Sequence, residues 1–307
     1  MNANDNQQPL MVVVVGATAV GKTAFSVQLA KDLGTEVISA DSRQMYTEMA
    51  IGTAKPTPEE MDGVPHYFVD DRSVEHPMSA GDFEREGMAA ALKIFEHHPV
   101  AVVAGGSGLY VKALLEGFDV MPEVPEGLRE TLNKRMETEG LTALQAELKW
   151  LDPVHYEVMD IQNPQRVIRA LEICHGTGQP YSSFRKGEGA KRPWRSLVIG
   201  LDRDRDELYE RINLRMDLML EAGLLDEAKK LHPLKNLPPL QTVGYQEIFG
   251  YLEGDYDWEE AVRLLKRNSR RYAKRQLTWF RRQAETEWYH PSQYEAVMNR
   301  IQEVLKD

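Results

Sequence analysis

The sequence has few of the residues that stabilise a fold through disulfide bonds or bound metal ions. Its 307 residues include one cysteine, Cys174, so no internal disulfide can form. The apolar residues next to Cys174 indicate a core thiol in a reducing compartment rather than a nucleophile. The eight histidines show no metal-ligand spacing. We therefore expect a cytoplasmic protein.

Long apolar runs are also absent. No run approaches the roughly 20 residues that cross a bilayer, and residues 1–9 lack the basic and apolar pattern of a signal peptide. We expect a short disordered lead-in there and no membrane association. With 42% apolar and 28% charged residues, the chain has the composition of a globular protein. Its length favours a main domain with a smaller one attached, and we expect a monomer.

Positive charge is scarce overall, since the formal net charge is −11. Yet residues 261–284 contain no acid and nine basic residues: Arg263, Lys266, Arg267, Arg270, Arg271, Lys274, Arg275, Arg281 and Arg282. Tyr272, Trp279 and Phe280 lie among them, which favours contact with a phosphate backbone and stacked bases. A solvated helix face is the alternative. An acidic remainder would confine nucleic acid to this one surface.

The strongest motif lies near the N-terminus. Residues 10–15 are six apolar residues, typical of a buried strand, and the following eight match G-x-x-x-x-G-K-[ST]. In this motif main-chain N–H groups face a polyphosphate, Lys22 adds charge, and Thr23 offers a hydroxyl to Mg²⁺. We predict that the chain binds a phosphorylated compound through a loop formed by Gly16, Ala17, Thr18, Ala19, Val20, Gly21, Lys22 and Thr23.

An acidic residue follows the next expected strand, residues 35–40. In a parallel α/β sheet the carboxyl ends of the strands line the ligand crevice, so Asp41 should face the phosphate loop. There it could hold Mg²⁺ through water or act as a general base. The alternative role is to cap the segment that follows. A further strand at residues 100–104 ends in Gly105 and Gly106 instead of an acid, which weakens the case for a motor-type NTPase.

Beyond residue 116 the pattern changes. Prolines and glycines at 116–127 indicate a hinge, and residues 121–195 show helices without obvious strands. The sheet resumes at residues 196–201, and the rest of the chain reads as helical. Arg211 and Arg215 lie one turn apart there and could hold one polyphosphate, or they could be solvated arginines on a helix. We predict an α/β fold: a P-loop NTPase-like parallel sheet flanked by helices, formed by residues 10–120 and 196–307, with an inserted all-helical subdomain at 121–195.

With these segments in hand, the chain resembles the tRNA dimethylallyltransferase (tRNA isopentenyltransferase) family from about residue 10 to residue 285. The ordered set of motifs is specific, whereas the loop alone is shared by many phosphate-binding families. The segments that carry the resemblance are residues 16–23, 41–46, 52–56, 105–110, 169–172, 244–245, 272–276 and 278–281. Ala17, Val20 and Ser107 depart from the family's usual residues, but none removes a donor or a charge that the mechanism needs.

The resemblance implies transfer of a dimethylallyl group from dimethylallyl diphosphate to N6 of the adenosine beside the anticodon, position 37, with release of pyrophosphate. The loop would hold the diphosphate with Mg²⁺ near Thr23, Lys22 and the two arginines would add counter-charge, and Asp41 would accept the amine proton. The resemblance places tRNA contacts at Asp41, Ser42, Arg43, Gln44, Ser107, Arg129, Gln165, Arg166, Val167, Ile168, Arg169, Gly244, Tyr245, Lys274, Arg275 and Gln276. The inserted subdomain would bind the anticodon stem-loop.

Three other functions remain open at this stage. An adenylate isopentenyltransferase would use the same donor with a free nucleotide, but the helical insert and the basic stretch exceed what a nucleotide requires. A small-molecule P-loop kinase would place ATP in the loop. A non-enzymatic nucleotide switch or RNA-binding module would not depend on Asp41.

Overall fold

The computed structural model of the protein describes residues 8–187, 189–283 and 285–306. Most of the expected lead-in, residues 1–7, lies outside the described residues. The chain divides into two compact units. Of the described residues, those up to 115 and from 192 onward form the main unit, and those between Glu116 and Lys191 form the inserted unit.

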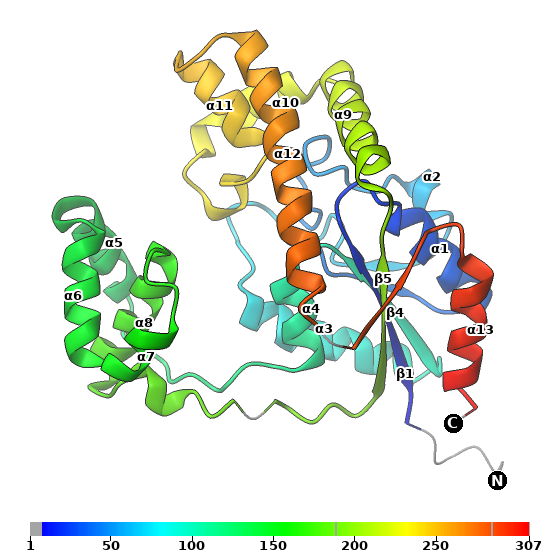
Figure 1. The fold of residues 1–307 in the computed structure, drawn as a ribbon, viewed down its shortest axis with the longest axis horizontal. Coiled ribbons are helices and arrows are strands. Elements are labelled where there is room, and N and C mark those ends of the chain that lie inside the picture. The colour runs from blue at the N-terminus through cyan, green and yellow to red at the C-terminus, as the bar shows by residue number, and fades with distance from the viewer. Residues whose placement is uncertain (1–7, 188, 284, 307) are drawn as a thin grey trace. The chain divides into compact units, whose positions relative to one another are not determined.

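The main unit is built on a six-stranded sheet in which every pair of neighbours is parallel (Figure 1). The strand order is β3-β2-β4-β1-β5-β6. The strands are β1 (Leu10–Gly16), β2 (Val37–Ser39), β3 (His66–Tyr67), β4 (Val100–Gly105), β5 (Arg195–Leu201) and β6 (Thr286–Tyr289). The expectation of a wholly helical C-terminal part was wrong at β6. This edge strand is only half-buried, so it has no apolar run that would reveal it.

The central strand β1 contributes side chains to two separate cores. Met11, Val13 and Val15 belong to one apolar cluster, which includes residues of α3, α4, α10, α11 and α12. Leu10, Val12 and Val14 belong to the other, with α1, α9 and α13. Successive side chains of a strand point to opposite faces, so helices on both faces bury every residue of β1.

Capping residues mark the ends of several helices of the main unit. Helix α1 ends at Gly34 in the left-handed conformation, and the Asp257 side chain accepts the Glu260 N–H at the start of α12. The bounds are α1 (Lys22–Leu33), α2 (Pro58–Met61), α3 (Ala80–Phe95), α4 (Gly108–Leu115), α9 (Arg205–Glu221), α10 (Leu224–Leu231), α11 (Tyr245–Glu253), α12 (Trp258–Phe280) and α13 (Tyr294–Val304), with short turns η2 (His232–Leu234) and η3 (Pro238–Leu240).

The inserted unit has its own apolar core. Helix α8 supplies most of that core, and Leu132, Leu144 and Leu148 pack against it from α5 and α6. The described residues of this unit form helices only: α5 (Leu128–Glu139), α6 (Leu141–Leu151), α7 (Pro153–Val158), α8 (Pro164–Thr177) and the short turn η1 (Tyr181–Phe184). The predicted fold class, a parallel sheet flanked by helices, is confirmed. Across the described residues, no helix combines the length and apolarity needed to cross a membrane.

Candidate active site

The carboxyl ends of four strands meet at one edge of the sheet. Gly16 of β1 is paired with Leu201 of β5, and Ala104 of β4 is paired with Ser39 of β2. The loops after these strands surround a cavity of about 440 Å³. The residues of its wall that bear on chemistry are Thr18, Lys22, Thr23, Asp41, Arg215 and Tyr272. The parallel sheet therefore brings together the phosphate loop and the acid that the sequence indicated.

The phosphate loop curls around the ammonium of Lys22. Gly16 and Gly21 have φ angles of 150° and 110°, and a Cβ atom at Gly16 would overlap the carbonyl oxygen of Leu201. Lys22 Nζ donates to the carbonyls of Gly16 at 3.0 Å and Ala17 at 2.8 Å. Burial lowers the pKa of Lys22 to about 8, Asp41 opposes this shift, and Arg215 adds to it. The cavity therefore contains the Lys22 ammonium, which has few negatively charged neighbours.

Arginines that follow β5 in the chain hold the tip of the phosphate loop by hydrogen bonds. Arg211 Nε donates to the Ala19 carbonyl at 2.9 Å, and Arg215 donates to the Thr18 hydroxyl at 3.1 Å. Burial lowers the pKa of Arg215, while Asp41 raises it. Sequence reasoning missed Arg203, whose Nε donates to the Val20 carbonyl at 2.8 Å. Its position just after β5 was the available signal, because that strand end also borders the crevice.

Gln276 of α12 joins two loops of the site. Its side chain is only 6% exposed, and it accepts the Thr18 N–H at 2.8 Å and donates to the Gly106 carbonyl at 2.9 Å. A Cβ atom at Gly106 would overlap this amide, which explains a glycine there. The side chain of Gln276 thus faces the phosphate loop, and its expected contact with tRNA stays a prediction. Beside it, burial raises the pKa of Tyr272 to about 12, with Asp41 adding to the shift.

Asp41 fixes the turn after β2 and also lines the cavity. One carboxylate oxygen, Oδ1, accepts the N–H groups of Arg43 at 2.9 Å and Gln44 at 3.3 Å, which fixes the turn after β2. Within the described residues, Oδ2 has no hydrogen-bond partner, and Asp41 lines the cavity. The carboxylate is therefore held by one oxygen, while the other is free to accept a hydrogen bond.

The neighbours of Asp41 are held by the loop after β4 and by the segment at residues 53–54. Ser107 Oγ accepts the Ser42 N–H at 2.9 Å and lies 3.1 Å from the Ser42 hydroxyl. Gln44 donates its side-chain amide to the carbonyls of Ala54 at 3.0 Å and Thr53 at 3.3 Å, so its amide oxygen remains as an acceptor. Arg43 Nε is buried and without a partner in the described structure, and an unpaired buried donor in a cavity wall suits a ligand acceptor.

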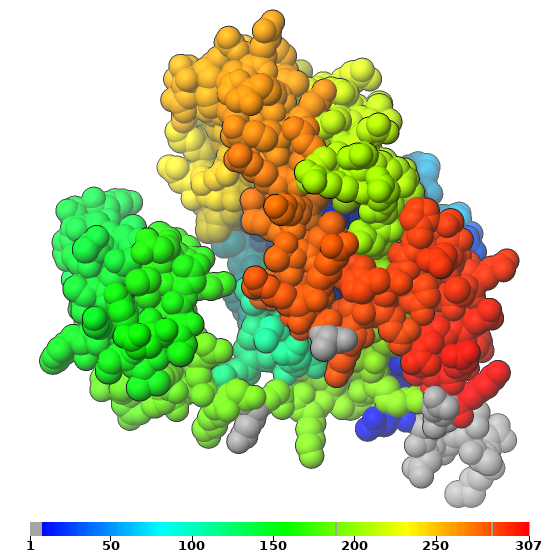
Figure 2. Space-filling model, in the orientation of Figure 1, coloured from blue at the N-terminus to red at the C-terminus, as the bar shows by residue number. Residues whose placement is uncertain are grey.

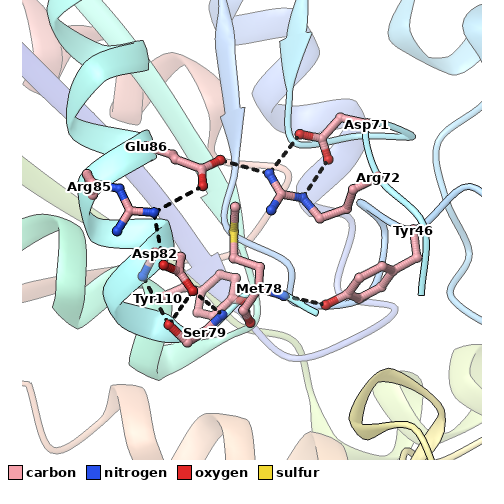
Figure 3. Close-up of polar contacts among 9 residues, drawn as sticks. All are labelled: Tyr46, Asp71, Arg72, Met78, Ser79, Asp82, Arg85, Glu86 and Tyr110. Atoms are coloured by element: carbon pink, nitrogen blue, oxygen red, sulfur yellow. Dashed lines mark hydrogen bonds and ion pairs between the residues drawn. The ribbon is translucent and has the colours of Figure 1, made fainter. Parts of the chain in front are cut away.

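The terminal tyrosines of two motifs bind the main chain of one residue, Met78 (Figure 3). Tyr46 Oη accepts the Met78 N–H at 3.1 Å, and Tyr110 Oη donates to the Met78 carbonyl at 2.9 Å. Tyr46 ends the segment that begins at Asp41, and Tyr110 lies three positions after Ser107. Both segments of the cavity wall are therefore tied to the same point of the chain.

Gly244 and Tyr245 support the site from α11. Gly244 lines the cavity, whereas the Tyr245 side chain is fully buried and donates to Glu227 at 2.7 Å. Glu227, which the sequence did not single out, also accepts the main-chain N–H groups of residues 50–52 at 2.8–3.0 Å. No side-chain atom of Tyr245 is exposed, and its expected contact with tRNA stays a prediction.

In the inserted unit the expected contact residues have two different environments. Val167 and Ile168 are buried in its apolar core and do not face solvent. Gln165 and Arg166 are exposed, and Arg129 and Arg169 are partly exposed. Only this second group presents polar side chains to a ligand.

The nine basic residues in α12 and just after it differ in whether they pair with acids. Arg263 and Lys266 pair with Glu260 and Asp217 at 2.5 and 2.6 Å, and Arg281 pairs with Asp202. Arg267 and Arg270 donate to Asn268 and Asn213 instead. Four exposed residues have no acidic partner among the described residues, and we call them the basic cluster: Arg271, Lys274, Arg275 and Arg282. They border a shallow hollow of about 430 Å³ together with Trp279. Figure 2 shows α12 at the surface along much of its length.

The donor set beside the loop fits Mg²⁺. Thr23 lines the cavity, and its hydroxyl has no hydrogen bond within the described residues. Those residues include no group of three or more His, Cys, Asp or Glu side chains that could hold a metal by themselves. An ion held mainly by substrate phosphates and water, with one hydroxyl and one nearby carboxylate, matches the preference of Mg²⁺.

Comparison with known proteins covers most of the chain. The family described as IPP transferase matches residues 44–283. The tRNA dimethylallyltransferase of Cytophaga hutchinsonii is 54% identical over 297 residues, covering 97% of this chain and 98% of that protein. The tRNA dimethylallyltransferase 1 of Bacteroides fragilis is 46% identical, with 96% and 98% covered.

Solved structures agree with these relatives. The tRNA isopentenylpyrophosphate transferase of Bacillus halodurans superposes with a TM-score of 0.72 at 42% identity, covering 98% of this chain and 97% of that one. A eukaryotic dimethylallyltransferase acting on tRNA gives a TM-score of 0.77 at 26% identity, covering 92% of this chain and 74% of that one. The chain belongs to the IPP transferase family.

Proposed function

We propose that this protein transfers a dimethylallyl group from dimethylallyl diphosphate to N6 of adenosine 37, next to the anticodon of tRNA, and releases pyrophosphate. One observation carries the proposal: a single cavity holds the cations of the phosphate loop and a carboxylate with one free oxygen. The relatives named for this reaction match the chain over nearly its full length.

The donor half of the cavity stabilises a leaving diphosphate. In the reaction the bond from C1 of the dimethylallyl group to oxygen breaks, and its electron pair leaves with pyrophosphate. Lys22 and Arg215 provide positive charge where that negative charge grows, so they stabilise the transition state more than the bound substrate. Mg²⁺, held near Thr23, would neutralise part of the same charge.

The acceptor half supplies the base. N6 of adenine forms the new bond to C1 and must lose a proton, because it becomes positively charged as the bond forms. Asp41 Oδ2 is available to take that proton and pass it to solvent. The amide oxygen of Gln44 can accept the second N6 hydrogen, since its own N–H groups are already used. Adenosine reaches this site after leaving the anticodon stack, at a cost of roughly a few kcal/mol.

RNA binding is assigned to exposed basic groups in each unit. We place the anticodon stem-loop against the basic cluster of α12 and against Arg129, Gln165, Arg166 and Arg169 of the inserted unit. These groups are exposed or partly exposed, and arginines and lysines at a surface suit the phosphate backbone.

The test is a transfer assay with labelled dimethylallyl diphosphate and Mg²⁺, using unmodified tRNA or AMP as acceptor. We expect label in tRNA only. Label in AMP but not in tRNA would identify a nucleotide prenyltransferase, and ATP consumption without prenyl transfer would identify a kinase.

A matched pair of variants separates the two roles of Asp41. Asp41→Asn keeps an oxygen that can accept the Arg43 and Gln44 N–H groups but removes the base, so turnover should fall by about 10²-fold or more while tRNA binding is retained. Asp41→Ala should lose the turn as well and weaken tRNA binding. Full activity of Asp41→Asn would show that the residue only caps the turn.

A further inference from the structure

A buried carboxylate lies beneath the exposed arginines of the inserted unit. Glu172 of α8 is 6% exposed. Its Oε2 accepts from Arg169 at 2.7 Å and from Arg129 of α5 at 3.3 Å. A second bond links Arg129 to the Gln165 side chain at 3.0 Å. One carboxylate oxygen thus joins two cations that are 40 residues apart in the sequence.

The two guanidinium groups remain available to a ligand. The side chains of Arg129 and Arg169 are 43% and 40% exposed. Each guanidinium has five N–H donors, of which hydrogen bonds to Glu172 and Gln165 use only one or two. With one negative and two positive charges, this trio retains a net charge of +1, and its free donors can bind a phosphate in the bidentate way that arginine allows.

An exposed arginine held in place binds at a lower entropic cost than a free one. Fixing such a side chain costs up to about 2 kcal/mol of rotamer entropy. Glu172 fixes the two arginine side chains when the protein folds, so this entropy is already lost before a ligand binds. Because the carboxylate is buried, two cationic partners also remove the penalty that an unpaired charge would carry.

We propose that Glu172 is a positioning residue, which orients Arg129 and Arg169 for the phosphate backbone of the tRNA anticodon stem-loop. The inference rests on the proposed function, because it takes tRNA as the ligand of this surface. Glu172 does not contact the RNA and acts only through the two arginines.

The variant Glu172→Gln distinguishes positioning from overall charge, because the two effects have opposite signs. Removing a negative charge makes the surface more positive, which by charge alone tightens RNA binding. Loss of positioning weakens it. We expect the KM for tRNA, and the Kd for an anticodon stem-loop RNA, to rise about tenfold. The KM for dimethylallyl diphosphate and kcat at saturating tRNA should change by less than about twofold, since the cavity is untouched.

Glu147 provides the matched control. It is a carboxylate of the same unit that pairs with Arg135 at 2.9 Å and His175 at 2.8 Å, but none of its partners is a proposed contact for tRNA. Glu147→Gln therefore removes the same charge and a comparable pair of contacts. We expect its Kd for the stem-loop RNA to stay unchanged or to fall slightly.

A double variant tests whether Glu172 acts through Arg129. If it does, Glu172→Gln combined with Arg129→Gln should bind RNA only slightly more weakly than Arg129→Gln alone. Additive losses, or an unchanged or lower Kd for Glu172→Gln, would overturn the proposal. Circular dichroism and thermal unfolding identify a variant that fails to fold, and Glu172→Asp, which keeps the charge, should then recover part of the affinity. RNA binding is measured without turnover, so a protein that binds as expected but transfers no prenyl group refutes the proposed function alone.

Discussion

Gln276 accepts a hydrogen bond from the main-chain N–H of Thr18 at 2.8 Å, although 258 positions separate the two residues. The same side chain donates to the loop that follows β4. The C-terminal part of α12 therefore sets the spacing between the phosphate loop and the residues next to Asp41. In the proposed reaction this spacing sets the distance between the leaving diphosphate and the amine that replaces it.

Replacing Gln276 should impair activity in a pH-dependent way. In Gln276→Glu the ionised side chain can still accept from Thr18 but cannot donate to the Gly106 carbonyl, which leaves two acceptors facing each other. An unmade buried hydrogen bond costs about 1–3 kcal/mol, so kcat/KM should fall roughly 5- to 150-fold at neutral pH. Protonation restores a donor, so activity relative to wild type should recover as the pH falls. Gln276→Ala, the control, should show no recovery, and parallel pH profiles would contradict this role.

Diphosphate binding should weaken as the pH rises through about 8. The pKa of Lys22 is lowered to about 8 in the free protein because its ammonium is buried, and a bound diphosphate raises it by adding nearby negative charge. Below pH 8 the ammonium is already charged. Above pH 8 binding must take up a proton, and affinity falls by up to tenfold per pH unit.

Calorimetry of the donor in buffers of different ionisation enthalpy would count this proton. Lys22→Met is the control, because titration of the ligand itself is common to both proteins. Its affinity should be lower throughout and lack the step near pH 8. The same pH dependence in both proteins would assign the step to another group.

Removing unpaired charges from α12 should change the salt dependence of tRNA binding. Lys274→Gln with Arg275→Gln removes two members of the basic cluster, so the slope of log K against log salt should decrease by about 1 for each charge. Arg263→Gln with Lys266→Gln removes the same charge from residues that are already paired with acids. That control should leave the slope nearly unchanged. Equal slopes for both double variants would show that the helix contributes only overall charge.

Glu227 should stabilise the fold through the turn at residues 50–52. Its carboxylate accepts three main-chain N–H groups and the Tyr245 hydroxyl. Glu227→Gln replaces an acceptor oxygen by an N–H₂ group that faces donors, at a cost of about 2 kcal/mol. The Tm of Glu227→Gln should therefore be lower than that of the wild type by about 4–8 °C. Tyr245→Phe, which removes only one of these bonds, should cost about half as much, and an unchanged Tm for Glu227→Gln would refute the role.

Much of this arrangement was predictable because it depends on local patterns. The apolar run of β1, the glycines and Lys22 of the phosphate loop, and the helix that follows are set by residues close together in sequence. Asp41 could be assigned to the same crevice because parallel strands end at a common edge. Strand β6 could not be predicted, since its pairing with β5 makes it a strand without giving it an apolar run.

The sequence by itself determined the fold class, the phosphate loop and the presence of a basic segment, because each follows from short-range periodicity, spacing or composition. The tertiary structure decided which charges are free. It paired Lys266 and Arg281 with acids and left the basic cluster open, and it turned Gln276 toward Thr18. Such pairings join residues far apart along the chain, and only packing of the folded elements brings them within hydrogen-bond distance.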